Sequence, residues 1–350
     1  MEGNIIFNKQ SYTFTEFATI SLPKDLNWAT NTQLFIKDWL NNKQSFLLQT
    51  SGSTGKPKNI SIQREQMLSS ANATIQYLDI QTGSSALLCM NPDMIGGRMM
   101  LVRALVGAWD LYILPPSSNP MIDASIAFTA MVPLQVESLM ESPEGIDFLN
   151  RIDQLIIGGA NISDSLSSKL QTIKAKAYQT FGMTETVSHI ALKKLNGEGK
   201  SDEYRLIGDN KIAVDAEGKL SIKGTVTGGE WIQTNDLVRQ TPNGFEWLGR
   251  SDLAVNSGGI KIQIEELEKE LCTFFQKKIW VWKKADKKLG EKVIGMTDDP
   301  KLISQIQSDY NSLKSNFKKY HLPKEWVLVK QWLLTSSGKP DRNNTLVLNK

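Results

Sequence analysis

The sequence contains few residues of the kinds that build covalent or metal-based scaffolds. Among its 350 residues are two cysteines, Cys89 and Cys272, and two histidines, His189 and His321. Two cysteines this far apart argue against a disulfide framework, and two histidines argue against a histidine-built metal site. A cysteine-poor chain without a charged-then-apolar leader is typical of the reducing cytoplasm, so we expect a cytoplasmic protein.

Long apolar runs and an excess of one charge are also lacking. No apolar run approaches the roughly 18 residues that a membrane helix needs, so no integral membrane segment is predicted. Forty basic and thirty-seven acidic residues are spread along the chain and give a formal charge of +3, which argues against nucleic acid as the main partner. The chain does have a hydrophobic fraction of 40%. This content, at this length, predicts a folded protein with two domains.

Short apolar runs alternate with helix-length segments in the first two hundred residues. The runs begin near residues 46, 85, 111, 126 and 154, and the stretches 62–77 and 161–174 have helical character. This spacing predicts βα units with a mostly parallel sheet that is buried on both faces. After about residue 200, turn signals at 215–218 and 241–244 predict antiparallel strands instead.

The pattern changes again from Gln263 onward. Ile264, Leu267 and Leu271 fall at helical spacing behind an acidic first turn, which predicts a helix. Strand-like runs and an amphipathic stretch follow, as in a small α+β unit of ordinary domain size. The predicted fold class is α/β. A large N-terminal domain of mixed and parallel sheets with flanking helices (1–249) is joined by a hinge to a small C-terminal α+β domain (250–350).

The loop TSGSTGKPK at 50–58 has the chemistry of a phosphate site. Its glycines let the backbone approach a ligand, and its hydroxyls and amides can donate to phosphate oxygens. A Walker loop requires Ser or Thr after Gly-Lys, whereas Gly55-Lys56 is followed by Pro57. Flexible surface turns use the same residue types, so the loop alone leaves both interpretations open.

Two later stretches offer oxygen ligands. YQTFGMTET (178–186) carries Thr184 beside Glu185, a pair that can hold a polar ligand group and a hard cation such as Mg²⁺. QTNDLV (233–238) puts Asp236 at a turn between strands, where a carboxylate can accept two ribose hydroxyls. Alone, Glu185 also fits a surface carboxylate, and Asp236 also fits a turn former.

Two further stretches offer charge near the C-terminus. LGRSDLAVNSGG (248–259) carries Arg250, Asp252 and a Ser-Gly-Gly turn, and TSSGKPDR (335–342) carries Lys339. Taken singly, Arg250 and Asp252 also fit a surface ion pair, and Lys339 also fits a solvated lysine.

In this order and at these spacings, the loop and the four later stretches resemble the acyl-adenylate-forming superfamily. That superfamily includes acyl- and aryl-CoA synthetases, the adenylation domains of peptide synthetases and luciferase. The resemblance runs from about residue 46 to residue 345, nearly the whole chain. It implies that the glycine-rich loop wraps the β- and γ-phosphates of ATP, through Thr50, Ser51, Gly52, Ser53, Thr54, Gly55 and Lys58.

The resemblance implies roles for the other stretches too. Residues 182–185 look like the Gly-x-Thr-Glu motif, with Thr184 and Glu185 in the catalytic site. Residues 234–236 look like the Thr-Gly-Asp motif, with asparagine in place of glycine. The segment Ile156 to Ala160 looks like the adenine-side loop, which implies that Gly159 and Ala160 bind the nucleotide.

The implied reaction has two steps. ATP converts the carboxylate into an acyl-adenylate, with Lys339 and a Mg²⁺ ion held by Glu185 neutralising charge at the α-phosphate. Asp236 and Arg250 would grip the ribose. The small domain would then turn about the hinge residue Asp252, and the thiol of CoA would displace AMP. The turn that this motion brings toward CoA is Ser257, Gly258 and Gly259.

Within the superfamily, FGMTETVSHIALKKLNG and GGRMMLVRAL resemble the o-succinylbenzoate-CoA ligases of menaquinone biosynthesis. This substrate has a second carboxylate, for which Arg98 and Arg103 are candidate partners. Gly97 would allow close approach, and Ser188 would donate to the ketone or a carboxylate. The alternative is an ordinary amphipathic helix over 94–105 with solvated arginines.

One departure from the superfamily is large. Its members usually carry more than a hundred residues before the phosphate loop, and this chain has forty-nine. The shortened region raises a homodimer as one way to complete the core. Three other functions stay open: a CoA ligase for another acid, a carrier-protein adenylation enzyme, and an inactive adenylate-binding regulator.

Overall fold

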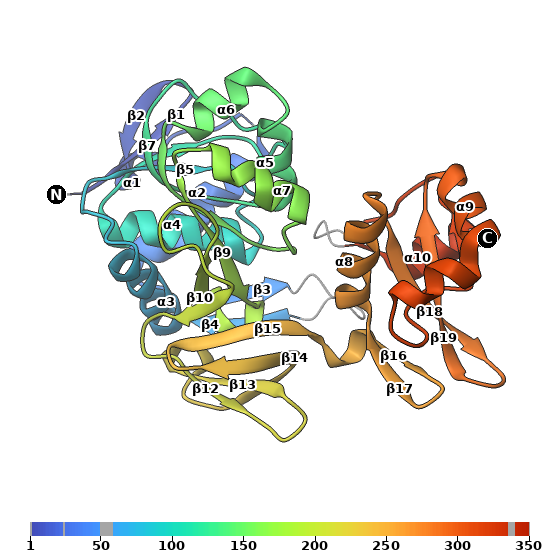
Figure 1. Ribbon diagram of the computed structural model, residues 1–350. Coiled ribbons are helices and arrows are strands. Elements are labelled where there is room, and N and C mark those ends of the chain that lie inside the picture. Colours follow the sequence, from blue (N-terminus) through green and yellow to red (C-terminus); the bar gives the residue numbers. More distant parts are fainter. Residues whose placement is uncertain (1, 24, 50–58, 335–339, 350) are drawn as a thin grey trace. The chain divides into compact units, whose positions relative to one another are not determined.

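The computed structural model describes residues 2–23, 25–49, 59–334 and 340–349 (Figure 1). The chain divides into two compact units, whose boundary runs through the strands β14 (Ile232–Thr241) and β15 (Gly244–Arg250). Unit 1 comprises Met1–Ala213, Ser221–Ile232 and Gln240–Glu246, and unit 2 comprises Val214–Leu220, Gln233–Arg239 and Trp247–Lys350. The predicted boundary of moving domains at residues 249 and 250 stays a prediction.

Thirteen strands of the described residues form one mixed sheet, in the order β12-β13-β14-β15-β11-β10-β9-β8-β7-β5-β6-β1-β2. Its centre is parallel, because β6, β5, β7, β8 and β9 pair in parallel one after another. The expectation of a parallel sheet built from the apolar runs is confirmed here. The five strands are β5 (Ser85–Leu88), β6 (Asp110–Ile113), β7 (Ile126–Met131), β8 (Ile152–Ile157) and β9 (Lys176–Gly182).

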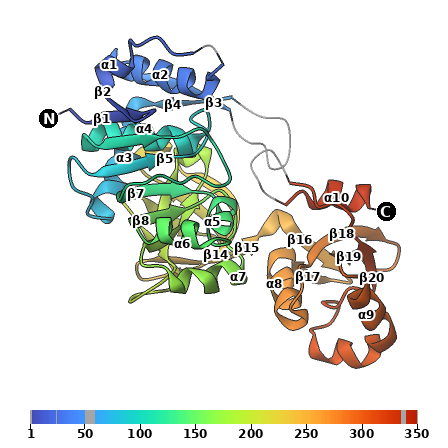
Figure 2. The ribbon, with the colours of Figure 1, turned by 90° about the horizontal axis from the view of Figure 1, so that it is seen from above.

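Helices flank these strands (Figure 2). One apolar core lies between the sheet and the later helices, where Val136, Phe148 and Leu166 pack with Leu155 and Ile157. Burial on both faces explains why strands such as β5 and β7 contain runs of buried residues rather than a strict alternation. The helical segments of this region are α3 (Arg64–Tyr77), α4 (Ile95–Gly107), α5 (Pro133–Leu139), α6 (Pro143–Leu149), α7 (Asp164–Lys169) and the 3₁₀ turn η1 (Leu170–Thr172).

The apolar run near residue 46 was expected in the parallel sheet, and this expectation was wrong. Strand β3 (Ser45–Gln49) instead pairs antiparallel with β4 (Asn59–Gln63) in a separate two-stranded sheet. Phe46 and Leu48 are buried while Leu47 between them is 64% exposed, so only one face of β3 is covered. Phe46 packs on the rings of Phe35 and Trp39. These two come from α2 (Asn27–Leu40), which follows β1 (Asn4–Phe7), β2 (Gln10–Thr13) and α1 (Phe14–Phe17).

The chain turns antiparallel after β9, as the turn signals predicted. β10 (His189–Lys194) pairs antiparallel with β9, and β11 (Glu203–Leu206) pairs antiparallel with β10 and β15. In the turn between β12 (Lys211–Val214) and β13 (Lys219–Lys223), the Asp215 carboxylate accepts from the backbone N–H groups of Glu217 and Lys219. Short 3₁₀ turns lie at η2 (Thr184–Thr186) and η3 (Thr225–Thr227).

Unit 2 has its own sheet and core. The strand order is β17-β16-β19-β18, and β20 pairs in parallel with β19. Helix α8 (Ile264–Phe275) buries Ile264, Leu267 and Leu271 against the sheet, as the helical spacing predicted. The other elements are η4 (Ser251–Leu253), β16 (Ala254–Ser257), β17 (Ile260–Gln263), β18 (Trp280–Asp286), β19 (Gly290–Thr297), α9 (Pro300–Leu313), η5 (Lys314–Asn316), β20 (Glu325–Leu328) and α10 (Arg342–Leu348).

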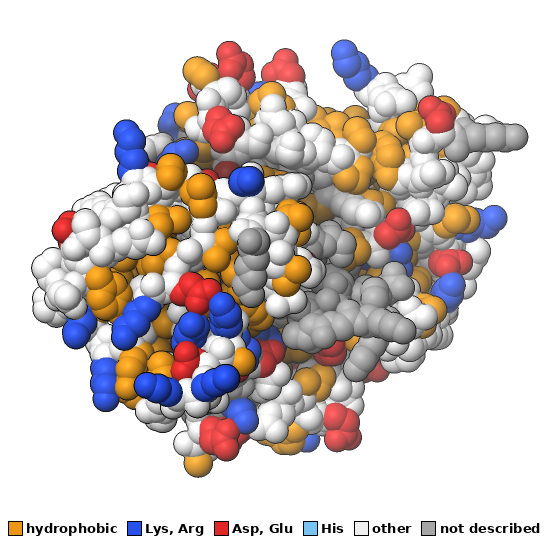
Figure 3. Space-filling model, turned by 90° about the vertical axis from the view of Figure 1, so that its right-hand side faces the viewer, with side chains coloured by type: hydrophobic (Ala, Val, Ile, Leu, Met, Phe, Trp, Pro, Cys, Tyr) orange, Lys and Arg blue, Asp and Glu red, His pale blue; other side chains and the backbone are white. Residues whose placement is uncertain are grey.

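Positive and negative side chains are mixed over the face shown in Figure 3. On β18 and β19, Lys283 pairs with Glu291 at 3.2 Å, and Lys284 and Lys292 pair with Glu325 at 2.7 and 2.9 Å. The lysines of these two strands are therefore neutralised locally. Across the described part of the chain, no helix has the length and apolar content to cross a bilayer.

Candidate functional site

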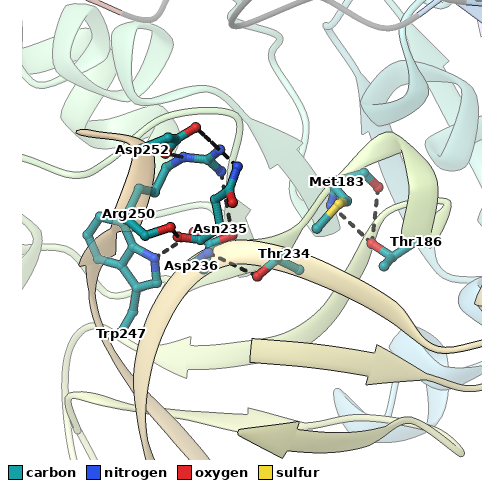
Figure 4. A network of polar contacts seen from close by, with 9 residues as sticks. Met183, Thr186, Thr234, Asn235, Asp236, Trp247, Arg250 and Asp252 are labelled. Atoms are coloured by element: carbon teal, nitrogen blue, oxygen red, sulfur yellow. Dashed lines mark hydrogen bonds and ion pairs between the residues drawn. The ribbon is translucent and has the colours of Figure 1, made fainter. Parts of the chain in front are cut away.

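A tight turn at the end of β9 carries the first predicted catalytic pair. A Cβ atom on Gly182 would lie 2.0 Å from the carbonyl oxygen of Ser188, so glycine is required there. Thr186 is buried and holds the turn, because its hydroxyl accepts from the N–H of Met183 at 3.0 Å (Figure 4). The same hydroxyl donates to the carbonyl of Ser188 at 2.8 Å. Thr184 is left partly exposed and Glu185 exposed. Both therefore stand at the carboxyl end of the strand, where ligands of open α/β sheets bind.

The donor set at Glu185 can be compared with the demands of Mg²⁺. Among the described residues, no three His, Cys, Asp or Glu side chains gather to hold a metal ion. Mg²⁺ is usually bound by one or two carboxylates together with substrate phosphates and water, rather than by a complete protein cage. One exposed carboxylate with a hydroxyl neighbour fits that pattern.

The predicted adenine-side loop follows β8 and shares this edge of the sheet. β8 and β9 are parallel neighbours, so their carboxyl ends lie together. A Cβ atom on Gly158 would lie 2.2 Å from the Thr180 hydroxyl, and Gly159 has φ +88°, a conformation that favours glycine. The structure thus brings Gly159 and Ala160 to the edge that carries Thr184 and Glu185.

Helix α4 carries the predicted acid-binding arginines, and Arg103 is fully buried, with 1% of its surface exposed. Its Nε donates to Thr74 Oγ1 at 3.2 Å and its Nη2 donates to Ser188 Oγ at 3.3 Å. Burial lowers the pKa of Arg103 to about 9, so the guanidinium stays charged at neutral pH. Within the described residues it has no carboxylate partner. The alternative of a solvated arginine at this position is wrong.

Arg98 has different surroundings. Its Nη2 lies 3.8 Å from an Asp93 carboxylate oxygen, its Nε donates to the Pro92 carbonyl at 3.2 Å, and its guanidinium lies over the Phe35 ring. Only 15% of the side chain is exposed. Gly97 is required by packing, because a Cβ atom there would lie 2.2 Å from the Asn91 carbonyl oxygen. Of the two arginines, Arg103 is the one with spare charge for a ligand.

The predicted ribose-binding carboxylate lies in unit 2 (Figure 4). Asp236 was expected at a turn, and this was wrong, because it lies inside the ten-residue strand β14. Its Oδ1 accepts from the indole Nε1 of Trp247 at 2.8 Å, and its Oδ2 lies 3.5 Å from Arg250 Nη1. Arg250 also donates twice to Asp252, at 3.0 and 2.8 Å. Burial opposes the charge of Arg250, but Asp252 and Asp236 outweigh it and raise its pKa.

Trp247 was not predicted from the sequence, because no local sequence pattern shows which tryptophan will donate a hydrogen bond to a carboxylate. Glu265, in the first turn of α8, was not predicted either. Burial raises the pKa of Glu265 to about 7, against the pull of Arg342. The Glu265 Oε2 lies 3.7 Å from where a Cβ on Gly249 would stand. Glu265 therefore faces the backbone at the predicted hinge, and only its place in an acidic first turn hinted at a role.

The other predicted residues divide into two groups. Gly258 and Gly259, with φ +57° and +82°, form the two-residue turn between β16 and β17, directly after the buried Ser257. Thr50–Lys58 and Lys339 lie outside the described residues. The roles of all these residues, and of Asp252 as a hinge, stay predictions.

Comparison with known proteins identifies the class. Residues 12–238 match the family of AMP-binding enzymes, and the chain belongs to that family. A solved structure from Dyadobacter fermentans, described as an acyl-CoA synthetase (AMP-forming)/AMP-acid ligase II-like protein, is 33% identical with a TM-score of 0.66. The similarity covers 96% of this chain and 98% of that one. The resemblance predicted from the motifs is confirmed.

Two further similarities are to proteins named as o-succinylbenzoate-CoA ligases. A 2-succinylbenzoate–CoA ligase from Listeria monocytogenes is 24% identical over 339 residues, which cover 88% of this chain and 71% of the relative. The o-succinylbenzoate CoA synthetase of Bacillus subtilis, solved with its acyl-adenylate intermediate, has a TM-score of 0.68 at 20% identity. That similarity covers 85% of this chain and 68% of the synthetase, and it shows a shared fold.

Proposed function

We propose that the protein is an o-succinylbenzoate-CoA ligase that uses ATP and CoA and releases AMP and pyrophosphate. The observation that carries the proposal is Arg103, a buried cation whose hydrogen-bond partners among the described residues are neutral. A buried charge is costly unless it is paired. o-Succinylbenzoate has two carboxylates, of which only one reacts, and the other one suits this cation. The Listeria relative of that name supports the choice of acid.

The chemistry begins with a carboxylate, which is a poor electrophile because its charge repels nucleophiles and oxide leaves badly. Adenylation replaces that leaving group with AMP. A bound Mg²⁺ would neutralise phosphate charge, and Glu185 with Thr184 would hold it. Lys339 would neutralise the charge that develops as pyrophosphate departs.

The nucleotide would be held in register by its ribose. Asp236 presents a carboxylate whose two oxygens face Trp247 and Arg250, so its orientation is set before a ligand arrives. A carboxylate that is already oriented would hold the ribose in one position, and this would place the α-phosphate correctly for the reaction. The CoA thiol would then attack the acyl carbon, and AMP would leave with the adenylate oxygen.

Product analysis by mass spectrometry tests this function. The wild-type protein is incubated with ATP, Mg²⁺, CoA and either o-succinylbenzoate, benzoate or a fatty acid. Formation of o-succinylbenzoyl-CoA and AMP is the expected result. Acyl transfer to a phosphopantetheinyl protein instead of CoA would indicate a carrier-protein enzyme. No pyrophosphate exchange with any acid would indicate an inactive regulator.

Arg103→Ala refines the test of the acid. Loss of a desolvated charge partner is expected to weaken use of o-succinylbenzoate by about 2 to 5 kcal/mol. Benzoate, which has no second carboxylate, should be affected much less if the wild type uses it. Arg98→Ala is the matched control, because Arg98 already has Asp93 nearby. Equal losses for both acids in Arg103→Ala would contradict the assignment.

The homodimer and the cytoplasmic location belong to the same proposal. An enzyme that acts on small dissolved substrates such as ATP and CoA suits the cytoplasm. Light scattering of the purified protein would measure whether two copies associate.

A further inference from the structure

A closed ring of hydrogen bonds lies around the Arg103 guanidinium. Thr74 comes from α3 and Arg103 from α4, while His189 is the first residue of β10 and Ser188 directly precedes it. The Thr74 and Ser188 hydroxyls accept from Arg103 Nε and Nη2, as described above. His189 joins the same hydroxyls from the other side, with Nε2 at 3.1 Å from Thr74 Oγ1 and Nδ1 at 3.3 Å from Ser188 Oγ.

The imidazole in this ring is neutral. Burial and the charge of Arg103 hold the pKa of His189 well below its ordinary value of 6.5. A neutral imidazole has one nitrogen that donates and one that accepts. Each of its two neighbours is a hydroxyl with a single proton, so the direction of one hydrogen bond fixes the direction of the others.

The Thr74 hydroxyl sets that direction. It donates its only proton to the Ser70 carbonyl, one helical turn back, at 3.0 Å. Thr74 Oγ1 can therefore only accept from His189, which places the proton on Nε2. His189 Nδ1 must then accept, and the Ser188 hydroxyl donates to it. The oxygen of Ser188 is left as an acceptor, which Arg103 Nη2 uses.

We propose that His189 is a positioning residue of the acid site, held as the Nε2–H tautomer, which commits the Ser188 proton and leaves Arg103 as the donor to the substrate. The inference rests on the proposed function. It assigns Ser188 the opposite role from the predicted one, since its hydroxyl proton is not available to a ketone or carboxylate.

The remaining N–H groups of Arg103 are available to a ligand. A guanidinium has five N–H groups, and two of those of Arg103 go to the two hydroxyls. A third points at the thioether of Met100, with 4.0 Å between Nη1 and Sδ, which is a weak acceptor. The acid site is thus specific for an anion, because its polar recognition comes from a fixed cation and not from a hydroxyl donor.

Nuclear magnetic resonance tests the tautomer directly. The chain has two histidines, so a long-range ¹H–¹⁵N spectrum of the full-length labelled protein contains two imidazoles, and His321→Gln assigns them. We expect His189 to show a protonated Nε2 and an unprotonated Nδ1, unchanged between about pH 5 and pH 8. A protonated Nδ1, or a ring that titrates in this range, would overturn the proposal.

Kinetics tests the positioning role. His189→Phe keeps a ring but neither hydrogen bond, and we expect it to raise KM for o-succinylbenzoate by roughly tenfold while KM for ATP is unchanged. His189→Gln, which keeps one donor and one acceptor, should recover most of this loss. In the double variant His189→Phe with Arg103→Ala, KM for o-succinylbenzoate should be little higher than in Arg103→Ala alone, because His189 acts through Arg103. Additive losses, or equal rises in both KM values, would contradict it.

The two arms separate this inference from the proposed function. If the wild type makes no o-succinylbenzoyl-CoA, the proposed acid is wrong, while the spectrum still reports the tautomer. If the product forms but the tautomer is Nδ1–H, the proposed function is supported and the proposed role of His189 is wrong. A folded His189→Phe protein is verified by its ATP KM, and the spectrum of the wild type needs no variant at position 189.

Discussion

At the scale of single residues, Trp247 sets the orientation of the carboxylate proposed to bind ribose. Its indole hydrogen bond to Asp236 is 2.8 Å long and is charge-assisted. Trp247→Phe keeps an aromatic ring and removes this donor. We expect KM for ATP to rise by roughly tenfold, with KM for the acid unchanged.

Trp231→Phe is the matched control, because half of the Trp231 surface is exposed. Steady-state kinetics with ATP varied at saturating acid and CoA measures the effect. An unchanged ATP KM in Trp247→Phe would show that the indole hydrogen bond is not required to orient the Asp236 carboxylate.

Glu265 gives a prediction about pH and stability. Its pKa in the fold, about 7, lies above the ordinary value of 4.5, so the folded protein holds this proton more tightly than the unfolded chain. The stabilisation is fully present below about pH 4.5 and is lost as the pH rises through about 7. At about 1.4 kcal/mol for each pKa unit, the loss is up to about 3 kcal/mol.

Glu265→Gln removes this dependence, because glutamine carries no proton to lose. The variant should be more stable than wild type near pH 8 and close to it near pH 4.5. Urea unfolding at both values measures the difference in free energy. A difference that does not change with pH would show that Glu265 titrates as an ordinary exposed carboxyl.

At the scale of elements, one ion pair ties α10 to α8. Arg342 Nε and Nη2 donate to the two Glu268 carboxylate oxygens at 2.7 and 2.6 Å, with 11% and 13% of the two side chains exposed. Glu268 also accepts from the Val281 N–H at 2.7 Å, which adds β18. Three elements of unit 2 therefore meet at one carboxylate, and Arg342 follows Lys339 by three positions.

Arg342→Ala leaves Glu268 buried without its partner and should destabilise unit 2 by about 3 to 5 kcal/mol. The double variant Glu268→Met with Arg342→Met removes both charges and should cost less than Arg342→Ala. Equilibrium unfolding of the three proteins provides the comparison. A double variant less stable than the single one would show that the pair itself is net stabilising.

The elements also show which parts of the fold are readable from sequence. β8 was predictable, because its second half, Leu155–Ile157, is a run of three apolar residues that are all buried. β3 was misassigned because five residues do not reveal their partner, and β4 begins only after the nine residues 50–58. Asp236 was expected in a turn because Asn-Asp usually forms one, and the pairing of β14 overrode that preference.

The candidate site was readable only where its residues are adjacent in sequence. Thr184 with Glu185, and Arg250 with Asp252, form recognisable local motifs. The ring around Arg103 joins residues 29 and 115 positions apart, and no local pattern marks Thr74 or His189 as its members. Arg103 itself was found through its helix, and its burial came only from the packed structure.

At the scale of the whole molecule, the two half-reactions should be separable. Lys339→Ala is expected to cripple adenylate formation and to leave thioester formation from a supplied adenylate largely intact, since the lysine charge matters while pyrophosphate departs. Pyrophosphate exchange measures the first step, and CoA consumption with the synthetic adenylate measures the second. Equal loss in both steps would refute this role for Lys339.

The charge of Arg103, which has no carboxylate partner among the described residues, also has a consequence for the resting protein. A folded chain that buries an uncompensated cation is less stable than the same chain with an anion in place, because a ligand that binds only the folded state stabilises it by mass action. Heating the protein with a panel of small dicarboxylic acids, in the absence of ATP and CoA, should therefore raise the melting temperature for the acids that fit. The size of the rise in melting temperature would then rank the acids by how well they bind, without any reaction taking place.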